Sequence, residues 1–143
     1  MTDDPALPAT ATPLDAAHAA AAAAPEDDAL RLALHGRLLE AELHLLLETE
    51  PEGDRLAPRV LALESGPVVL AFDRDDRLAE FLATTLGAPA PYAALTGRRL
   101  VALLARQGLG LGINLGVAPS EMLLPPAAID WLAALAASRP ERT

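Results

Sequence analysis

The stretch Val68-Val69-Leu70-Ala71-Phe72, followed at once by Asp73-Arg74-Asp75-Asp76, decides the fold. A half-exposed strand alternates apolar and polar side chains, whereas an uninterrupted apolar run is typical of a strand buried on both faces. The acidic residues that come next suit the positive end of a helix dipole. Behind them apolar residues recur at helical spacing up to Gly87, which predicts the end of that helix. We therefore expect an interior strand that leads directly into a helix.

Strands are also expected before this one. Ser65-Gly66-Pro67 predicts a turn that joins residues 59–64 to residues 68–73 as a hairpin. Residues 42–48 are short, apolar and bounded by charge, which predicts a strand, although their leucines equally suit a continuing helix. The polar residues 49–57 between them are expected to be a loop.

Two helices are expected at the start of the domain. Thr12 suits an N-cap, Pro13 the first helical position and Asp15 the positive end of the dipole, and the helix should stop at Pro25. A second helix should begin within residues 25–28. It carries leucines at four-residue spacing that would face a core, namely Leu30, Leu34 and Leu38.

The C-terminal third predicts a loop, two helices and a strand. Residues 87–92 contain two prolines and are expected to be a loop, after which Thr96 should cap a helix that ends near Gly108. Residues 109–115 should form a fourth strand. A last helix should start at Pro126 and turn one apolar side to the core, with Ile129, Leu132, Leu135 and Ala136.

The expected order is therefore α-α-β-β-β-α-α-β-α. It predicts an α/β fold: a two-layer sandwich whose mixed, mostly antiparallel sheet of about four strands has helices packed on it. One domain should cover residues 12–138, preceded by a disordered tail at 1–11 and followed by a tail at 139–143.

Composition narrows the function classes. The chain has 143 residues and a formal net charge of −9, so it lacks the clustered cations that nucleic acid or an anionic membrane surface requires. It has no cysteine, which excludes disulfides and thiolate chemistry. Its acidic first residues do not fit a secretory signal, and no apolar run is long enough to cross a membrane. We expect a cytoplasmic protein.

The glycines of residues 108–116 suggest a dinucleotide site at first sight. Such a site needs G-x-G-x-x-G at a turn from a strand into a helix, but the position three after Gly112 is Leu115, and Val117-Ala118-Pro119 does not begin a helix. We expect these glycines instead to permit close packing of a helix over the strand.

The remaining candidates for chemistry are also explained by structural roles. The histidines at 18, 35 and 44 lack metal-binding spacing. The carboxylates at 73–76 are explained by their favourable interaction with the positive end of a helix dipole. The serines lack a nucleophile motif, and Ser120 is expected to cap a short helical turn. We expect no catalytic residue, no metal and no cofactor.

Four residues are better candidates for binding a partner or ligand than for catalysis. Arg98 and Arg99 lie in the first turn of their helix, where cations are unfavourable, so they either bind an anion or pair with nearby acids. Trp131 and Tyr92 are two of the few aromatic residues, and aromatic side chains often anchor interfaces. The alternative for both is packing in the core.

Residues 69–81, together with 108–116 and the central Ile113-Asn114-Leu115-Gly116, resemble the N-terminal domain of the SseB family, a bacterial family. In that family an apolar strand ends in a Phe-Asp or Phe-Thr step, a helix follows, and a later Gly-rich strand carries an Asn. The resemblance covers residues 28–137 and implies an α/β sandwich without an assigned enzymatic activity, so no catalytic residue is carried over. It adds Asn114 to the candidate binding residues, although Leu115-Gly116 stands where Asn-Pro-Gly is commoner.

Three hypotheses follow. The leading one is a cytoplasmic, non-enzymatic module that binds a protein partner. The second is a small-molecule sensor or uncharacterised enzyme with a pocket near residues 108–116 and the Arg98-Arg99 turn. The third is a homodimer whose interface is the helix that carries Trp131.

Overall fold

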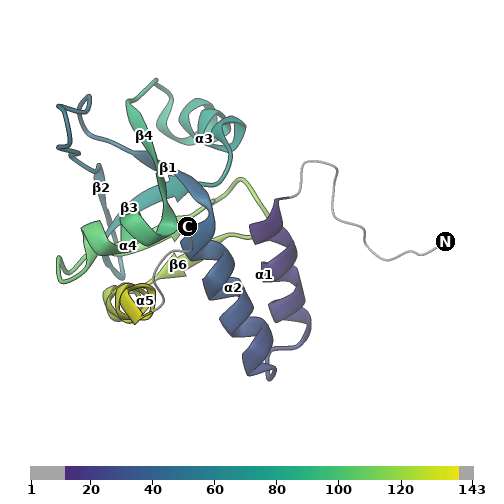
Figure 1. The fold of residues 1–143 in the computed structure, drawn as a ribbon. Coiled ribbons are helices and arrows are strands. Elements are labelled where there is room, and N and C mark those ends of the chain that lie inside the picture. The colour runs from purple at the N-terminus through teal and green to yellow at the C-terminus, as the bar shows by residue number, and fades with distance from the viewer. Residues whose placement is uncertain (1–11, 139–143) are drawn as a thin grey trace.

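The computed structural model describes residues 12–138, and the tails predicted at 1–11 and 139–143 lie outside the described residues. Helices and strands are distributed along the whole of this range (Figure 1). Their order is α1 (Pro13–Ala23), α2 (Asp28–Glu40), β1 (Glu42–Leu46), β2 (Val60–Leu63), β3 (Gly66–Phe72), α3 (Asp75–Phe81), the π-helical turn η1 (Leu82–Leu86), β4 (Tyr92–Thr96), α4 (Gly97–Leu104), β5 (Gly110–Ile113), β6 (Met122–Leu124) and α5 (Pro126–Ser138).

The sheet is mixed and mostly antiparallel, as predicted, but it has six strands where the sequence indicated four. Its order is β4-β1-β3-β5-β6, with β2 paired to β3, and only the pair β3–β5 is parallel. The two unpredicted strands, β4 and β6, form the two ends of this order. β4 contains two alanines, which have low strand propensity, and three-residue β6 is too short to show a periodicity.

Strand β3 is the centre of the fold. One edge pairs with β1 through His44↔Phe72 and with β2 through Val60↔Val69, and the other edge pairs with β5. Residues 68–72 are all buried, which confirms the interior strand predicted from its apolar run.

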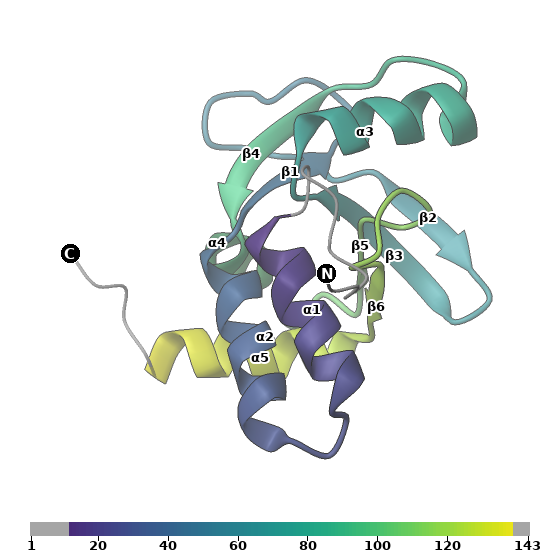
Figure 2. The ribbon, with the colours of Figure 1, turned by 90° about the vertical axis from the view of Figure 1, so that its right-hand side faces the viewer.

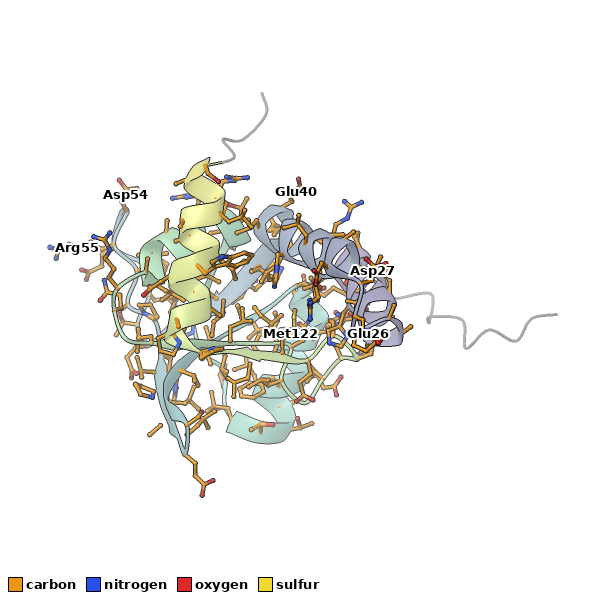
Figure 3. All side chains as sticks on the ribbon, turned by 90° about the horizontal axis from the view of Figure 1, so that it is seen from below. Glu26, Asp27, Glu40, Asp54, Arg55 and Met122 are labelled. Carbon is orange, nitrogen blue, oxygen red and sulfur yellow. The ribbon has the colours of Figure 1, made fainter. Side chains whose placement is uncertain are left out.

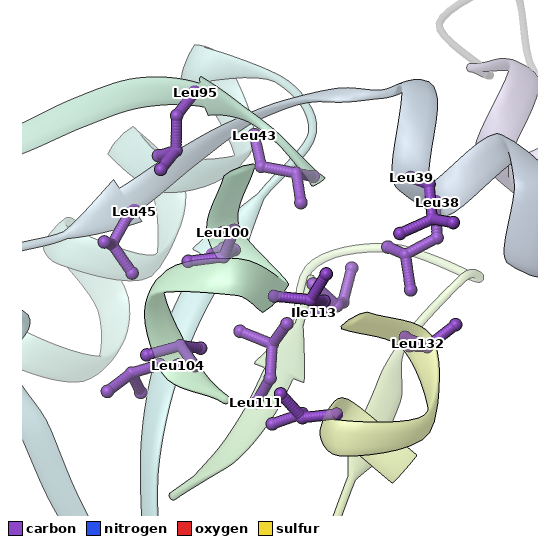
Figure 4. Packing of buried hydrophobic residues seen from close by; sticks show 14 of the residues in the cluster. Leu38, Leu39, Leu43, Leu45, Leu95, Leu100, Leu104, Leu111, Ile113 and Leu132 are labelled. Atoms are coloured by element: carbon purple, nitrogen blue, oxygen red, sulfur yellow. The ribbon is translucent and has the colours of Figure 1, made fainter. Parts of the chain in front are cut away.

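The sheet is covered on both faces, so the two-layer arrangement predicted from the sequence is wrong. Val69 and Ala71 of β3 belong to the larger core, which also receives side chains from α1, α2, α4 and α5 (Figure 4). Val68, Leu70 and Phe72 point the other way, into a smaller core closed by Leu78 and Phe81 of α3. Figure 2 shows α3 on one side of the sheet and the other helices on the opposite side. A strand that is apolar on both faces requires this second helical layer.

The helix starts follow their local sequence. Thr12 and Asp15 form a capping box at α1, Asp27 caps α2, and the Thr96 hydroxyl accepts a hydrogen bond from the Arg99 amide at α4. The helix after β3 ends, as predicted, at Gly87, which adopts φ 73°.

The glycines of β5 have a different role from the one predicted. A Cβ at Gly112 would lie 2.6 Å from Leu115 Cδ1 and 2.8 Å from Leu70 Cδ2. Gly112 therefore makes room for side chains of β3 and of the loop after β5, not for a helix. The helices α4 and α5 pack on the opposite face, where Leu111 and Ile113 of β5 are buried.

Candidate interaction surface

Buried polar residues gather at the carboxyl ends of the parallel strands β3 and β5, the place where open α/β sheets commonly bind ligands. Asp73 directly follows β3, and Asn114 directly follows β5. The buried polar residues of the described chain are Asp15, Arg77, Asn114 and Ser120. With Asp73, whose side chain is only 3% exposed, they form a single hydrogen-bonded network.

Arg77 is the centre of this network. Its Nη2 donates to Asp15 Oδ2 at 2.5 Å, and its Nη1 donates to Asp15 Oδ1 at 3.0 Å and to Asp73 Oδ1 at 2.7 Å. Thr12 closes the outer side, where its hydroxyl donates to Asp73 Oδ2 at 2.5 Å. The N-terminus of α1 is thereby fixed to α3 across the end of the sheet.

Asn114 and Ser120 complete the network from the loop after β5. Asn114 Oδ1 accepts a hydrogen bond from the Asp73 amide at 3.1 Å, and its Nδ2 donates to Ser120 Oγ at 2.9 Å. The Ser120 hydroxyl in turn donates to Asp15 Oδ1 at 2.5 Å. Ser120 therefore does not cap a helical turn, as the sequence had indicated. Asn114 has no exposed surface, so its amide serves the network and is not presented to a ligand.

The protonation of Asp15 fits a structural role for these residues. Burial by itself raises the pKa of Asp15, but hydrogen bonds from Arg77, Ser120 and Thr12 outweigh it and hold the pKa below its ordinary value. Asp15 is then ionised at neutral pH and paired with a permanently charged guanidinium. A general acid or base changes protonation near the working pH, which this carboxylate does not do.

Arg98 and Arg99 do not form a joint site. Arg98 Nη1 donates to the Ala136 carbonyl oxygen at 2.6 Å, so it satisfies a carbonyl in the last turn of α5. The exposed Arg99 engages Thr96 through its backbone amide.

Tyr92 and Trp131 are both exposed, but they lie on opposite sides of the sheet. Tyr92 is 46% exposed and pairs with Leu46, whose side chain belongs to the core under α3. Trp131 is 50% exposed and lies on α5, on the other side. The structure therefore does not unite the predicted recognition residues in one patch.

Trp131 is the centre of an apolar area between α2 and α5. Figure 3 shows the molecule from below, with α5 in yellow. The Trp131 ring meets His35 of α2 edge-on at a centroid distance of 5.0 Å. Leu32, one turn earlier on α2, is 37% exposed, and Ala127 and Ala134 flank Trp131 on the exposed side of α5. We call these five residues the α2–α5 surface.

The α2–α5 surface is poor in charge. Asp130 is the one charged residue of α5, and its Oδ1 accepts a hydrogen bond from the Arg106 amide at 2.9 Å. Burial lowers the pKa of His35, and Arg31 lowers it further, so the imidazole is neutral at pH 7. Its Nδ1 is buried and has no hydrogen-bond partner among the described residues. The five side chains of the α2–α5 surface are thus uncharged at pH 7, with the Arg31 cation at their border. Surfaces that contact protein often carry a half-exposed tryptophan among uncharged side chains.

A pocket does lie beside the Gly-rich strand, but it is small. Its volume is about 180 Å³, below the roughly 300–1,000 Å³ of most small-molecule sites. Gly108 and Gly110 line it together with residues 65–68 and 123–126, none of which is charged, and neither Arg98 nor Arg99 reaches it. The two parts of the small-molecule hypothesis are therefore separate in space.

Sequence reasoning missed the Arg77 network, and it considered His35 only as a possible metal ligand, not as a partner of Trp131. Asp15 and Arg77 are 62 positions apart, and no local pattern links them. The one available signal was the spacing of Asp73 and Arg77, which at four residues places both on one side of a helix turn.

Comparison with family models, curated proteins and solved structures finds no match to this chain. Within residues 12–138 no helix is long and apolar enough to span a membrane. In the same range no three acidic or histidine side chains come together as ligands for a metal ion.

Proposed function

We propose that this protein is a non-enzymatic interaction module that binds a partner protein through the α2–α5 surface. The observation that supports this most directly is Trp131, the only tryptophan of the chain, which is half exposed on a nearly uncharged helix. Half-exposed tryptophans in apolar surroundings are among the residues that contribute most to binding energy when a partner covers them.

The shape of the surface favours a helical partner. Ala127 and Ala134 lie one turn to either side of Trp131, so a helix can approach α5 closely beside the indole ring. His35 supports the ring from α2 and limits its rotation, which reduces the entropy lost on binding. The same features suit a second copy of this chain, with Trp131 of each copy placed over the alanines of the other.

The interior argues against catalysis at the usual ligand position of the sheet. At the carboxyl ends of β3 and β5 the start of α1 packs over the strands, and the carboxylates of Asp15 and Asp73 are both held by the Arg77 guanidinium. The resemblance to the SseB family and the cytoplasmic location are parts of the same proposal.

Photo-crosslinking tests this function. A benzophenone amino acid at Ala134, on the α2–α5 surface, should give a specific adduct in cells, whereas the same residue at the exposed Ala62 of β2 should not. Trp131→Ala should abolish the adduct. Mass spectrometry of the adduct then separates a different partner from a second copy. Equal adducts from both positions, or an adduct that survives Trp131→Ala, would contradict the proposal.

A further inference from the structure

The outer edge of β4 presents backbone hydrogen-bonding groups that no described residue uses. β4 is an end strand and pairs only with β1. The Leu47 amide donates to the Pro91 carbonyl at 2.9 Å, and this pairing continues along the strand as Leu45↔Ala93 and Leu43↔Leu95. Because bonding alternates along an antiparallel pair, the N–H and C=O groups of Tyr92 and Ala94 point away from the sheet.

A groove runs beside this edge. α3 lies next to β4 in both ribbon views (Figures 1 and 2). A hollow of about 390 Å³ between them has an apolar floor and an acidic end. Its lining residues are Asp75, Asp76, Leu78, Ala79, Leu82 and Tyr92.

The carboxylates of the groove are only partly neutralised, because Arg74 pairs with Asp76 and attracts Asp75 from a greater distance. Asp75 is exposed and makes no ion pair with any described residue, and Glu80 on the same helix is also exposed and unpaired within residues 12–138. Arg77 points inward to Asp15 and Asp73, and Arg74 is engaged by Asp76 at 2.8 Å. The outer side of α3 therefore offers carboxylates to a cation.

We propose that the β4–α3 groove binds an extended basic peptide segment of a partner, which adds to the sheet as a strand beside β4. The backbone groups of Tyr92 and Ala94 supply the pairing, and alternate side chains of the peptide enter the groove. A Lys or Arg side chain there places its cation near Asp75 and its aliphatic stem against the ring of Tyr92. Tyr92 packs edge-on against His44 at a centroid distance of 5.6 Å, which fixes the ring in this position.

This site goes beyond the α2–α5 surface and is independent of it. The two lie on opposite sides of the sheet, and neither residue set includes a member of the other. Either proposal can fail while the other holds, and Trp131 fluorescence distinguishes them because it reports only on the α2–α5 surface.

The test uses the whole chain and a nine-residue fluorescent peptide of alternating Lys and Val, at 150 mM salt. Fluorescence anisotropy should show saturable binding, and NMR should show the largest shifts at the Tyr92 and Ala94 amides. The peptide can be N-methylated at its odd-numbered or at its even-numbered residues. Only one of these two patterns should weaken binding, by at least tenfold, because only alternate N–H groups of an added strand face β4. Asp75→Asn should weaken it several-fold, whereas Glu52→Gln, a matched change in a distant loop, should leave it unchanged.

Ala94→Pro removes one outward N–H without touching a bond to β1, and it should reduce binding at least tenfold. Ala94→Val keeps the N–H and serves as its control, and the melting temperatures of both variants show whether the fold is intact. The proposal would be overturned if the peptide did not bind, or if Asp75→Asn and Glu52→Gln weakened binding equally. It would also be overturned if N-methylation of the peptide had no effect on binding. A peptide that instead changes Trp131 fluorescence would also overturn it.

Discussion

At the scale of single residues, the Ser120 hydroxyl shows how the polar network gains its stability. It accepts a hydrogen bond from Asn114 and donates one to an ionised carboxylate, and all three groups are buried. Ser120→Ala leaves the buried Asn114 Nδ2 without its partner and removes one of the two hydrogen bonds to Asp15 Oδ1, without opening a large cavity. We expect it to lower the free energy of unfolding at pH 7 by about 1–3 kcal/mol, measured by urea denaturation.

The pH dependence of this loss identifies its cause. Because the folded pKa of Asp15 is depressed, its contribution to stability is complete above the unfolded pKa of about 3.9 and is lost as pH falls through the folded value. The Ser120 hydrogen bond favours the ionised form, so the difference between wild type and Ser120→Ala should shrink below about pH 4. Arg99→Ala, a change at an exposed cation, should alter stability by less than about 0.5 kcal/mol. A difference that stays constant down to pH 2 would mean that the hydroxyl acts by packing alone.

At the scale of elements, the junction between β4 and α4 depends on one glycine. The Gly97 amide donates to the Ala41 carbonyl at 2.9 Å, which brings the start of α4 against the end of α2. A Cβ at Gly97 would lie 1.8 Å from the Leu38 carbonyl oxygen, and backbone cannot move aside as a side chain can. We expect Gly97→Ala to destabilise the fold by about 3 kcal/mol or more.

Gly36 provides the matched control. It lies inside α2, and a Cβ there meets nothing within 4 Å. Gly36→Ala should therefore stabilise the chain by about 0.5–1 kcal/mol, since alanine is the better helix former. Thermal denaturation of the two variants side by side tests the contrast, and a stable Gly97→Ala protein would show that α2 and α4 can separate freely.

The elements also show which parts of the fold are predictable from sequence. Thr12, Thr96 and Gly87 were identifiable as helix ends, and the start of α2 could be placed within residues 25–28, because caps depend on a few neighbouring residues. β4 was missed because its central Ala93 and Ala94 have low strand propensity, and its pairing with β1 is set by the tertiary structure. The second helical layer was implied by β3 itself, whose five buried residues need partners on both faces.

At the scale of the whole molecule, the candidate sites depend on contacts that no local pattern encodes. Arg77 and Asp15 meet across 62 positions, and His35 meets Trp131 across the gap between two helices. Trp131 could be proposed as a contact residue from the sequence because the chain has few aromatic residues. Its exposure could not be predicted, because the exposure depends on the position of the end of α2 relative to α5. Asn114 shows the converse: a residue singled out by resemblance is fully enclosed.

The net charge of −9 is a property of the whole molecule with a measurable effect. Excess negative charge repels itself in the compact state, whereas the buried pair of Arg77 and Asp15 is little affected by screening. Raising NaCl from 20 to 300 mM at pH 7 should therefore increase the melting temperature by about 3–6 °C, equivalent to about 1 kcal/mol. Near the isoelectric point of about 4.6 the net repulsion vanishes, and the same salt step should have little effect. An equal increase in melting temperature at both pH values would mean that salt acts on apolar burial. A lower melting temperature in high salt at pH 7 would mean that the exposed ion pairs outweigh the repulsion between negative charges.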